Sequence, residues 1–123
     1  MTSNTAQKSN DKVYKVVPEP MWMNSCEKGI FEGSLDDRRD GFIHLSSAPQ
    51  LLGTLNKYFR GQSNLVLIAF ERNTLAQNLR WEVSRNGELF PHYYGALPTN
   101  LAVAATPLGA NADGDWTIDE DCL

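Results

Sequence analysis

Residues 40–61, DGFIHLSSAPQLLGTLNKYFRG, contain a strand-like segment that runs directly into an amphipathic helix. Successive side chains of a strand point to opposite faces. Phe42, His44 and Ser46 therefore share one face, and the two apolar residues between them point towards the core. His44 thus lies beside a hydroxyl group on a partly apolar wall, which is the usual composition of a small-molecule pocket.

The second half of this stretch predicts a helix at about residues 48–59. Ser47 and Gln50 have the spacing of a capping box, in which each residue hydrogen-bonds the backbone amide of the other. Pro49 lies in the first turn, where the missing N–H of proline is harmless. An apolar stripe with helical spacing follows and consists of Leu51, Leu52, Leu55 and Phe59.

Strand signals lie on both sides of this unit. NLVLIAF (64–70) is a continuous apolar run, which is typical of a central strand covered on both faces. KVYKVV (12–17) and LAVAAT (101–106) predict two further strands.

The rest of the chain up to the central run predicts one short helix and one loop. A helix is expected near residues 20–28, ended by Gly29. The polar segment 31–40 has no hydrophobic period and predicts an exposed, mobile loop. These elements together predict an α+β fold, in which two main helices pack on one strongly bent, mainly antiparallel sheet.

Asn86 and Gly87 separate two short β-rich runs and predict a hairpin with a two-residue turn. That turn would place Trp81 opposite His92 and on the same face of the hairpin. Glu82 would lie on the other face. Pro91 favours a bulge, because proline cannot donate to the ladder, and a bulge would shift His92 relative to Glu82. The face that carries Glu82 is therefore left open.

The length and composition indicate a single soluble domain. A chain of 123 residues can fold around one core without metals or disulfides. We expect a disordered lead at 1–11, the α+β domain at 12–106 and an acidic, irregular tail at 107–123. Trp116 is expected to lie on the surface, and the tail to be dispensable for folding. The lead lacks the apolar core of a signal peptide, and no run is long enough to span a membrane, so a cytoplasmic location is expected.

The net charge of −4 comes mainly from the tail. A nucleic-acid binder normally presents a basic face that neutralises several phosphates. The body of this chain is near neutral, so no polymeric nucleic acid is expected as a partner, and the oligomeric state is left open. Cys26 and Cys122 lack the spacing of a metal or redox motif, and no metal site is expected. The acidic residues of the tail are Asp113, Asp115, Asp119, Glu120 and Asp121.

His44 and His92, the two histidines of the chain, are the candidate catalytic residues. Each lies on a predicted strand and is followed two positions later by a residue with a hydroxyl group. We therefore expect both to line one pocket; the alternative for each is a core histidine with a structural hydrogen bond. Histidine exchanges protons near neutral pH, which favours general acid–base chemistry. The expected ligand contacts are Phe42, Ser46, Gln50, Trp81, Glu82 and Tyr94.

DGFIHLSSAPQ (40–50) and RWEVSRNGELFPHYYGALP (80–98) resemble the family called domain of unknown function 952, over about residues 13–104. Members are sometimes labelled glutathione S-transferase related, although this chain is without a thioredoxin-like half. The order of elements and the His-x-Ser pattern are also similar to the catalytic half of RNA 2'-phosphotransferases. That similarity implies an ADP-ribosyltransferase-like fold with NAD as cofactor. It would place His44 and Ser46 along the dinucleotide cleft and Arg38 or Arg39 near a catalytic arginine, which makes Arg39 a further expected ligand contact.

Three classes of function follow from these observations. The first is an acid–base enzyme, of isomerase, cyclase or lyase type, that acts on a small metabolite or nucleotide. The second is an NAD-dependent ADP-ribosyl- or phosphotransferase-like enzyme. The third is a binding or interaction module with a degenerate cleft. A cleft with few glycine and arginine residues disfavours tight pyrophosphate binding, which favours the first and third classes.

Overall fold

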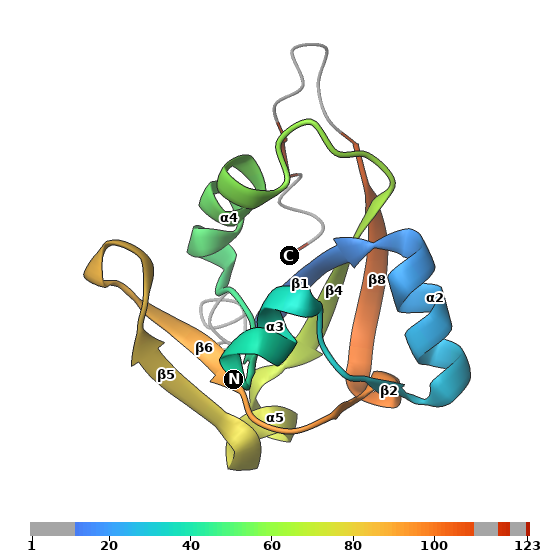
Figure 1. Ribbon diagram of the computed structural model, residues 1–123, viewed down its shortest axis with the longest axis vertical. Helices are drawn as coiled ribbons and strands as arrows, with labels where there is room; N and C mark the ends of the chain where they lie inside the picture. Colours follow the sequence, from blue (N-terminus) through green and yellow to red (C-terminus); the bar gives the residue numbers. More distant parts are fainter. Residues whose placement is uncertain (1–11, 110–115, 119–122) are drawn as a thin grey trace, which may run out of the picture.

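The apolar run in the middle of the sequence forms β4 (Leu65–Glu71), the central strand of an antiparallel sheet. In the computed structural model, which describes residues 12–109, 116–118 and 123, β4 lies between β1 (Lys12–Pro18) and β8 (Ala102–Leu108) (Figure 1). Side chains of β4 enter two separate core clusters, so the prediction of a central strand covered on both faces is confirmed. One cluster takes Val66, Ile68 and Phe70, and the other takes Leu65, Leu67 and Ala69.

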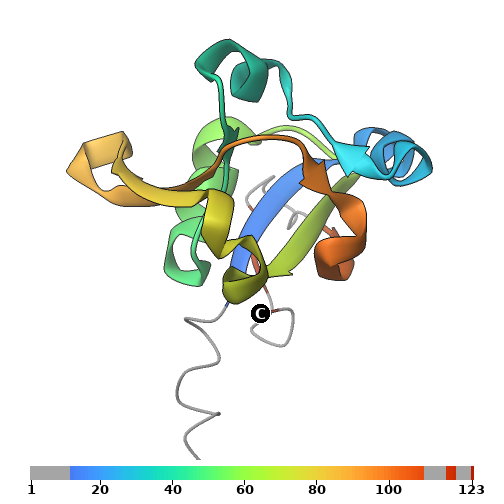
Figure 2. The ribbon, with the colours of Figure 1, turned by 90° about the horizontal axis from the view of Figure 1, so that it is seen from below.

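The other strands form two smaller antiparallel sheets. β3 (Ile43–His44), β6 (Leu89–Tyr93) and β5 (Leu79–Val83) form a sheet in the order β3-β6-β5, and β2 (Ile30–Phe31) pairs with β7 (Leu97–Pro98). The α+β class and the antiparallel pairing are therefore confirmed. The expected single bent sheet is corrected to three sheets. Figure 2 shows the β5–β6 hairpin extending away from the β1-β4-β8 sheet.

A single bridge fastens the β3 segment to the large sheet. Tyr14 and Ser46 exchange two backbone hydrogen bonds, with N···O distances of 2.8 and 2.9 Å. Ile43 and Leu45 are buried with 2% exposure each, as the alternating pattern predicts. The bridge therefore holds the strand that carries His44 against the edge of β1.

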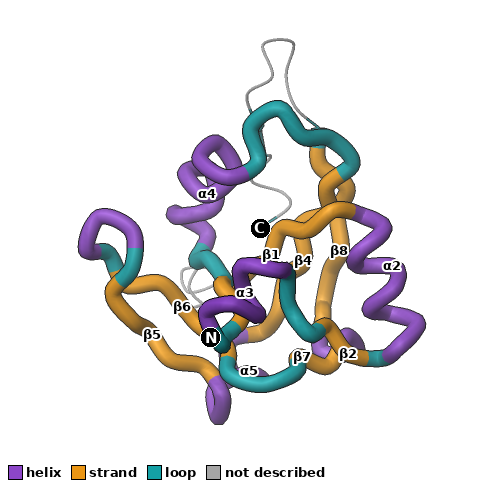
Figure 3. Tube along the Cα trace, in the orientation of Figure 1, coloured by secondary structure: helices purple, strands orange, loops and turns teal. Residues whose placement is uncertain are grey.

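The described part of the chain contains four α-helices (Figure 3): the two main helices that were predicted and two short ones. The two predicted ones are present as α2 (Glu19–Lys28) and α4 (Leu51–Tyr58), the second preceded by a 3-10 turn. Of the two short helices, α3 (Leu35–Asp40) was not predicted, and α5 (Arg72–Leu75) lies in a segment whose sequence is compatible with a turn or a helical turn. Within the described ranges, every helix is too short or too polar to cross a membrane. The 3-10 turns lie at Ala48–Gln50, Ala76–Asn78 and Thr99–Leu101, with a further turn at Arg85–Gly87.

α3 replaces the exposed loop expected at 31–40. Ser34 and Asp37 form a capping box: Asp37 Oδ2 accepts from the Ser34 amide at 2.9 Å, and Ser34 Oγ accepts from the Asp37 amide at 3.3 Å. Gly41 ends the helix in the left-handed conformation, with φ of 85°. A six-residue helix is too short to show an apolar period, so only the cap could have revealed it.

The β5–β6 hairpin has a register one residue away from the predicted one. Ser84 donates to the carbonyl of Glu88, so the turn has three residues, 85–87, instead of two. Trp81 therefore lies opposite Pro91, and its side chain packs against the core instead of sharing the face of His92. The same shift brings Glu82 onto the face of His92.

Trp116 is buried, with 2% exposure, which corrects the expectation that it lies on the surface. Its indole Nε1 donates to the carbonyl of Phe59 at 3.0 Å, and its amide donates to Asn56 Oδ1 at 3.1 Å. It belongs to the core cluster that α4 covers. The predicted lead at 1–11 lies outside the described residues. So does the rest of the predicted tail beyond 109, except for residues 117, 118 and 123.

Candidate functional site

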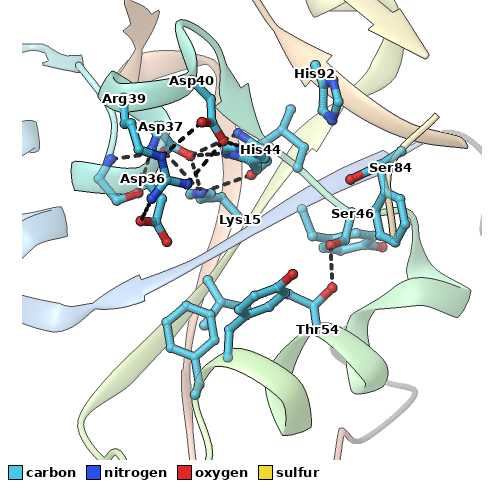
Figure 4. Close-up of a pocket in the computed structure, with 17 residues that line it drawn as sticks. Lys15, Asp36, Asp37, Arg39, Asp40, His44, Ser46, Thr54, Ser84 and His92 are labelled. Carbon is cyan, nitrogen blue, oxygen red and sulfur yellow. Dashed lines mark hydrogen bonds and ion pairs between the residues drawn. The ribbon is translucent and has the colours of Figure 1, made fainter. Parts of the chain in front are cut away.

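His44 and His92 are directly opposite each other on neighbouring strands, β3 and β6. Their ring centroids are 5.5 Å apart, and both rings line one cavity of about 270 Å³ (Figure 4). The prediction that both histidines reach one pocket therefore agrees with the geometry. The cavity lies between α3, α4, β1 and the β5–β6 hairpin, which contributes Ser84 and Phe90.

The cavity has a polar side and an apolar side. In Figure 4 the charged residues gather at one end, around His44, while His92 lies at some distance from them. The polar lining residues are Lys15, Ser34, Asp36, Asp37, Arg39, Asp40, His44, Ser46, Thr54, Ser84 and His92. The others are Tyr14, Val16, Leu45, Tyr58, Phe59 and Phe90.

His44 is held between two carboxylates of α3. Its Nδ1 lies 2.6 Å from Asp37 Oδ1, and its Nε2 lies 2.9 Å from Asp40 Oδ2. Carboxylate oxygens accept hydrogen bonds and do not donate them, so both ring nitrogens donate only when the ring is an imidazolium. The Asp37 side chain is 2% exposed and the Asp40 side chain 33%, so one carboxylate is fixed in the interior and the other faces solvent.

Lys15 compensates the buried charge of Asp37. Its ammonium lies 3.0 Å from Asp37 Oδ2 and donates to the carbonyl of His44 at 2.9 Å. Burial alone raises the pKa of Asp37, but the hydrogen bond from His44 and the charge of Lys15 outweigh burial and hold this pKa well below its usual range. Burial lowers the pKa of Lys15, and Asp37 offsets that effect only in part. Lys15 thereby links β1, α3 and β3.

Arg39 is part of a charged chain at the mouth of the cavity. Its Nη1 lies 3.0 Å from Asp36 Oδ1, and its Nε lies 3.0 Å from Asp40 Oδ1. The hydrogen bond from Arg39 lowers the pKa of Asp40. The Arg39 side chain is largely exposed, at 67%.

His92 has a different environment from His44. Its Nδ1 lies 2.7 Å from Glu82 Oε1, which also accepts from the Tyr94 hydroxyl at 2.8 Å. The hydrogen bond from His92, followed by that from Tyr94, lowers the pKa of Glu82, and the same contact raises the pKa of Tyr94. His92 is 3% exposed, and within the part of the chain that the structure describes its buried Nε2 has no hydrogen-bond partner.

The Phe42 ring contacts the rings of both histidines. Its ring stacks on His92 with centroids 4.0 Å apart and planes 22° apart, and it contacts His44 at 4.6 Å. It also meets the Tyr94 ring at 5.4 Å. Phe42 therefore fixes the orientation of both imidazoles from outside the cavity lining.

The remaining predicted contacts differ in position. Ser46 lines the cavity and its hydroxyl lies 3.1 Å from that of Thr54. Gln50 lies outside the lining. Its Oε1 accepts from the Ser47 amide, which is the capping role, and its Nε2 donates to the carbonyl of Leu89 in β6. Trp81 also lies outside the lining and stacks with Arg72, whose guanidinium is 4.8 Å from the indole centroid.

Lys15, Asp37 and Asp40 belong to the site but not to the residues predicted for it. Lys15 lies in a segment whose pattern predicts a strand and nothing more, and both aspartates lie in the segment predicted as a loop. The Ser-x-x-Asp spacing of Ser34 and Asp37 was the one signal that could have identified α3, and with it the two carboxylates.

The charged lining is close to electrically neutral. Lys15 and Arg39 carry two positive charges beside the three carboxylates of α3, and a protonated His44 would add the third positive charge. In the ranges 12–109, 116–118 and 123, no three potential metal ligands are grouped together. The arrangement can orient a polar ligand and accept a proton at His92 Nε2.

These features define a small α+β protein with a pocket lined by two carboxylate-bound histidines. The chain belongs to the family described as protein of unknown function (DUF952), whose sequence profile matches residues 16–105. This establishes the resemblance to that family, whereas a relation to RNA 2'-phosphotransferases is not among the similarities found.

Solved structures of protein CC0527 from Caulobacter crescentus are similar to this chain. Its crystal structure has 40% sequence identity and a TM-score of 0.86, and the match covers 90% of this chain and 97% of CC0527. Its solution NMR structure has 41% identity and a TM-score of 0.81, with 89% and 95% covered. A search of curated proteins found no match. The comparisons thus establish the family and its fold.

Proposed function

We propose that the cavity binds a small polar metabolite and that His92 acts on it as a general base. The observation that carries this proposal is that His92 lines the cavity and that its buried Nε2 has no hydrogen-bond partner among the described residues, while its Nδ1 lies 2.7 Å from Glu82 Oε1. An Nδ1–H that donates to a carboxylate leaves the lone pair on Nε2. A buried acceptor of this kind costs free energy unless a ligand or water supplies a donor.

The proposed step moves one proton. An O–H or acidic C–H group of the ligand gives its proton to His92 Nε2, and the electron pair of the broken bond stays on the ligand. Glu82 stabilises the imidazolium that forms, because its carboxylate is already hydrogen-bonded to Nδ1. Return of the proton to another atom gives an isomerase, and departure of a leaving group gives a lyase or cyclase.

His44 has a supporting role in this proposal. Its two ring nitrogens lie 2.6 and 2.9 Å from carboxylate oxygens, so neither is free to accept a proton from a ligand. The His44 ring centroid lies 5.5 Å from that of His92, and a protonated His44 would stabilise negative charge that develops on the ligand. The two histidines are thus assigned different roles, instead of two equivalent proton carriers.

The size and charge of the cavity favour a small metabolite over NAD or a polymer. A volume of about 270 Å³ lies just below the usual range for ligand pockets. The cations that line it are balanced by carboxylates, whereas a pyrophosphate site normally presents unpaired donors and a positive excess. We therefore favour the metabolite over the ADP-ribosyltransferase-like alternative and over polymeric nucleic acid.

A thermal-shift screen of a metabolite panel tests the proposal, with His92→Gln and Cys26→Ser compared with the wild type. A ligand at one hundred times its Kd adds about 2.7 kcal/mol of stability. Hits should raise the Tm of the wild type and of Cys26→Ser, whose thiol is exposed on α2, and should lose most of that shift in His92→Gln. Hits that shift all three proteins equally would refute the role of His92.

A further inference from the structure

The Asp40 carboxylate occupies a cradle of three donors at the mouth of the cavity. Arg39 Nε lies 3.0 Å from Oδ1, Arg39 Nη2 lies 3.4 Å from Oδ2, and His44 Nε2 lies 2.9 Å from the same Oδ2. An arginine fork with an imidazole is a typical carboxylate-binding arrangement. The Asp40 carboxylate therefore occupies the position in which these three donors would bind the carboxylate of a ligand.

Asp40 is the replaceable member of this cluster. Its side chain is 33% exposed, compared with 2% for Asp37, which is fixed by Lys15, His44 and the helix cap. Asp40 is also the last residue of α3, where a carboxylate meets the negative end of the short helix. Rotation of this side chain into solvent would free all three donors and leave the buried ion pair intact.

We propose that the substrate is a small carboxylic acid whose carboxylate displaces Asp40 from Arg39 and His44. This inference rests on the proposed function of the same cavity, and it assigns the chemical class of the ligand. With its carboxylate in the cradle at the mouth, the rest of the molecule enters the cavity that His92 lines. Asp40 then acts as an internal competitor that lowers the apparent affinity, because the empty cradle is only a fraction of the population.

Acetate and glycolate are suitable probes, and acetamide and glycolamide are their neutral counterparts. Binding is followed by NMR titration of the Arg39 Nε–H and His44 imidazole resonances at constant ionic strength. Asp40→Ala should bind acetate and glycolate at least fivefold more tightly than the wild type, because the competitor is gone. The two amides should bind at least tenfold more weakly than the acids.

Asp36→Ala is the matched control. Asp36 is an exposed carboxylate of the same helix and lies 3.0 Å from Arg39 Nη1, but it does not contact His44. Its removal changes the net charge by the same amount and leaves the cradle occupied, so the gain in affinity should be less than twofold. An equal gain in both variants would show a general charge effect and overturn the proposal, as would equal binding of acid and amide.

Two double variants separate this inference from the proposed function. Asp40→Ala with His44→Gln should lose the gain in acetate affinity, since one donor of the cradle is removed. Asp40→Ala with His92→Gln should keep it, because His92 lies outside the cradle. If the metabolite screen yields hits that depend on His92 but carry no carboxylate, the inference is wrong while the proposed function stands. If acetate binds at Arg39 and His44 but binding of the metabolite hits does not depend on His92, the inference stands and the proposed function is wrong.

Discussion

Lys15 and Asp37 form an ion pair with N···O distances of 3.0 and 3.2 Å across 22 positions of sequence, and only 12% and 2% of the two side chains are exposed. The pair joins the edge strand β1 to the short helix α3, and the same ammonium holds the backbone of β3 through the carbonyl of His44. The position of His44 therefore depends on a lysine from the start of the domain.

Lys15→Met should destabilise the fold by about 3 kcal/mol, because it leaves a buried carboxylate without its cation. Urea unfolding at neutral pH measures the change. The double variant Lys15→Met with Asp37→Asn should recover part of the loss, since the uncompensated charge is then gone. Equal stabilities of the wild type and Lys15→Met would contradict the importance assigned to the pair.

Asp37→Asn should weaken the acid dependence of stability. The folded pKa of Asp37 is lower than its unfolded value, so its stabilising effect is fully present above about pH 4 and is lost as the pH falls through the folded pKa. Urea unfolding between pH 7 and pH 3 should show a smaller loss in Asp37→Asn than in the wild type. Asp36→Asn, on the exposed side of α3, serves as the control and should keep the wild-type dependence.

Glu82→Gln should lower the pKa of Tyr94. The hydrogen bond to the Glu82 carboxylate raises this pKa in the wild type, and an uncharged amide removes the charge that opposes formation of the phenolate. Ultraviolet titration of the tyrosines should show one group ionising at lower pH in the variant. Tyr94→Phe identifies the transition, which should be missing from its titration curve; an unchanged curve in Glu82→Gln would argue against the contact.

Trp116→Ala should cost about 3 kcal/mol or more, because it empties a buried site and removes the hydrogen bond to Phe59. Trp116→Phe should cost less, since most of the apolar volume is kept. Truncation after Gly109 should be at least as destabilising as Trp116→Ala. A truncated chain with wild-type stability would restore the expectation that the tail is dispensable.

The parts of the fold that the sequence predicted are those with a long apolar pattern. β4 and α4 were found from a run of seven residues and from a helical stripe, and α2 from its flanking proline and glycine. α3 was missed because six residues give no period, and the fold of this segment depends on the contacts of Asp37 with Lys15 and His44. Tertiary contacts of this kind leave no local signal.

The site was predicted in part for the same reason. Alternation along β3 was sufficient to place His44 and Ser46 towards one pocket, and His92 joined them as expected. The partners of His92 depended on the length of a turn: a two-residue turn would have brought Trp81 to its face, and the three-residue turn brings Glu82. The Asn-Gly pair is compatible with both turns, so the sequence alone could not assign the Glu82 carboxylate to the face of His92.

The residues that line the pocket are far apart in the sequence, and this separation affects when the pocket can form during protein synthesis. The pocket needs Lys15 from the first strand and His92 from the sixth, so its walls come from almost the whole domain. During synthesis the chain emerges from its N-terminal end. A nascent chain that has exposed α3 and β3 but not yet β6 carries His44 without the strand that pairs with β3. The cavity therefore cannot form before residue 92 has been synthesised, and binding of the proposed ligand would report that β1, α3, α4 and the β5–β6 hairpin have come together.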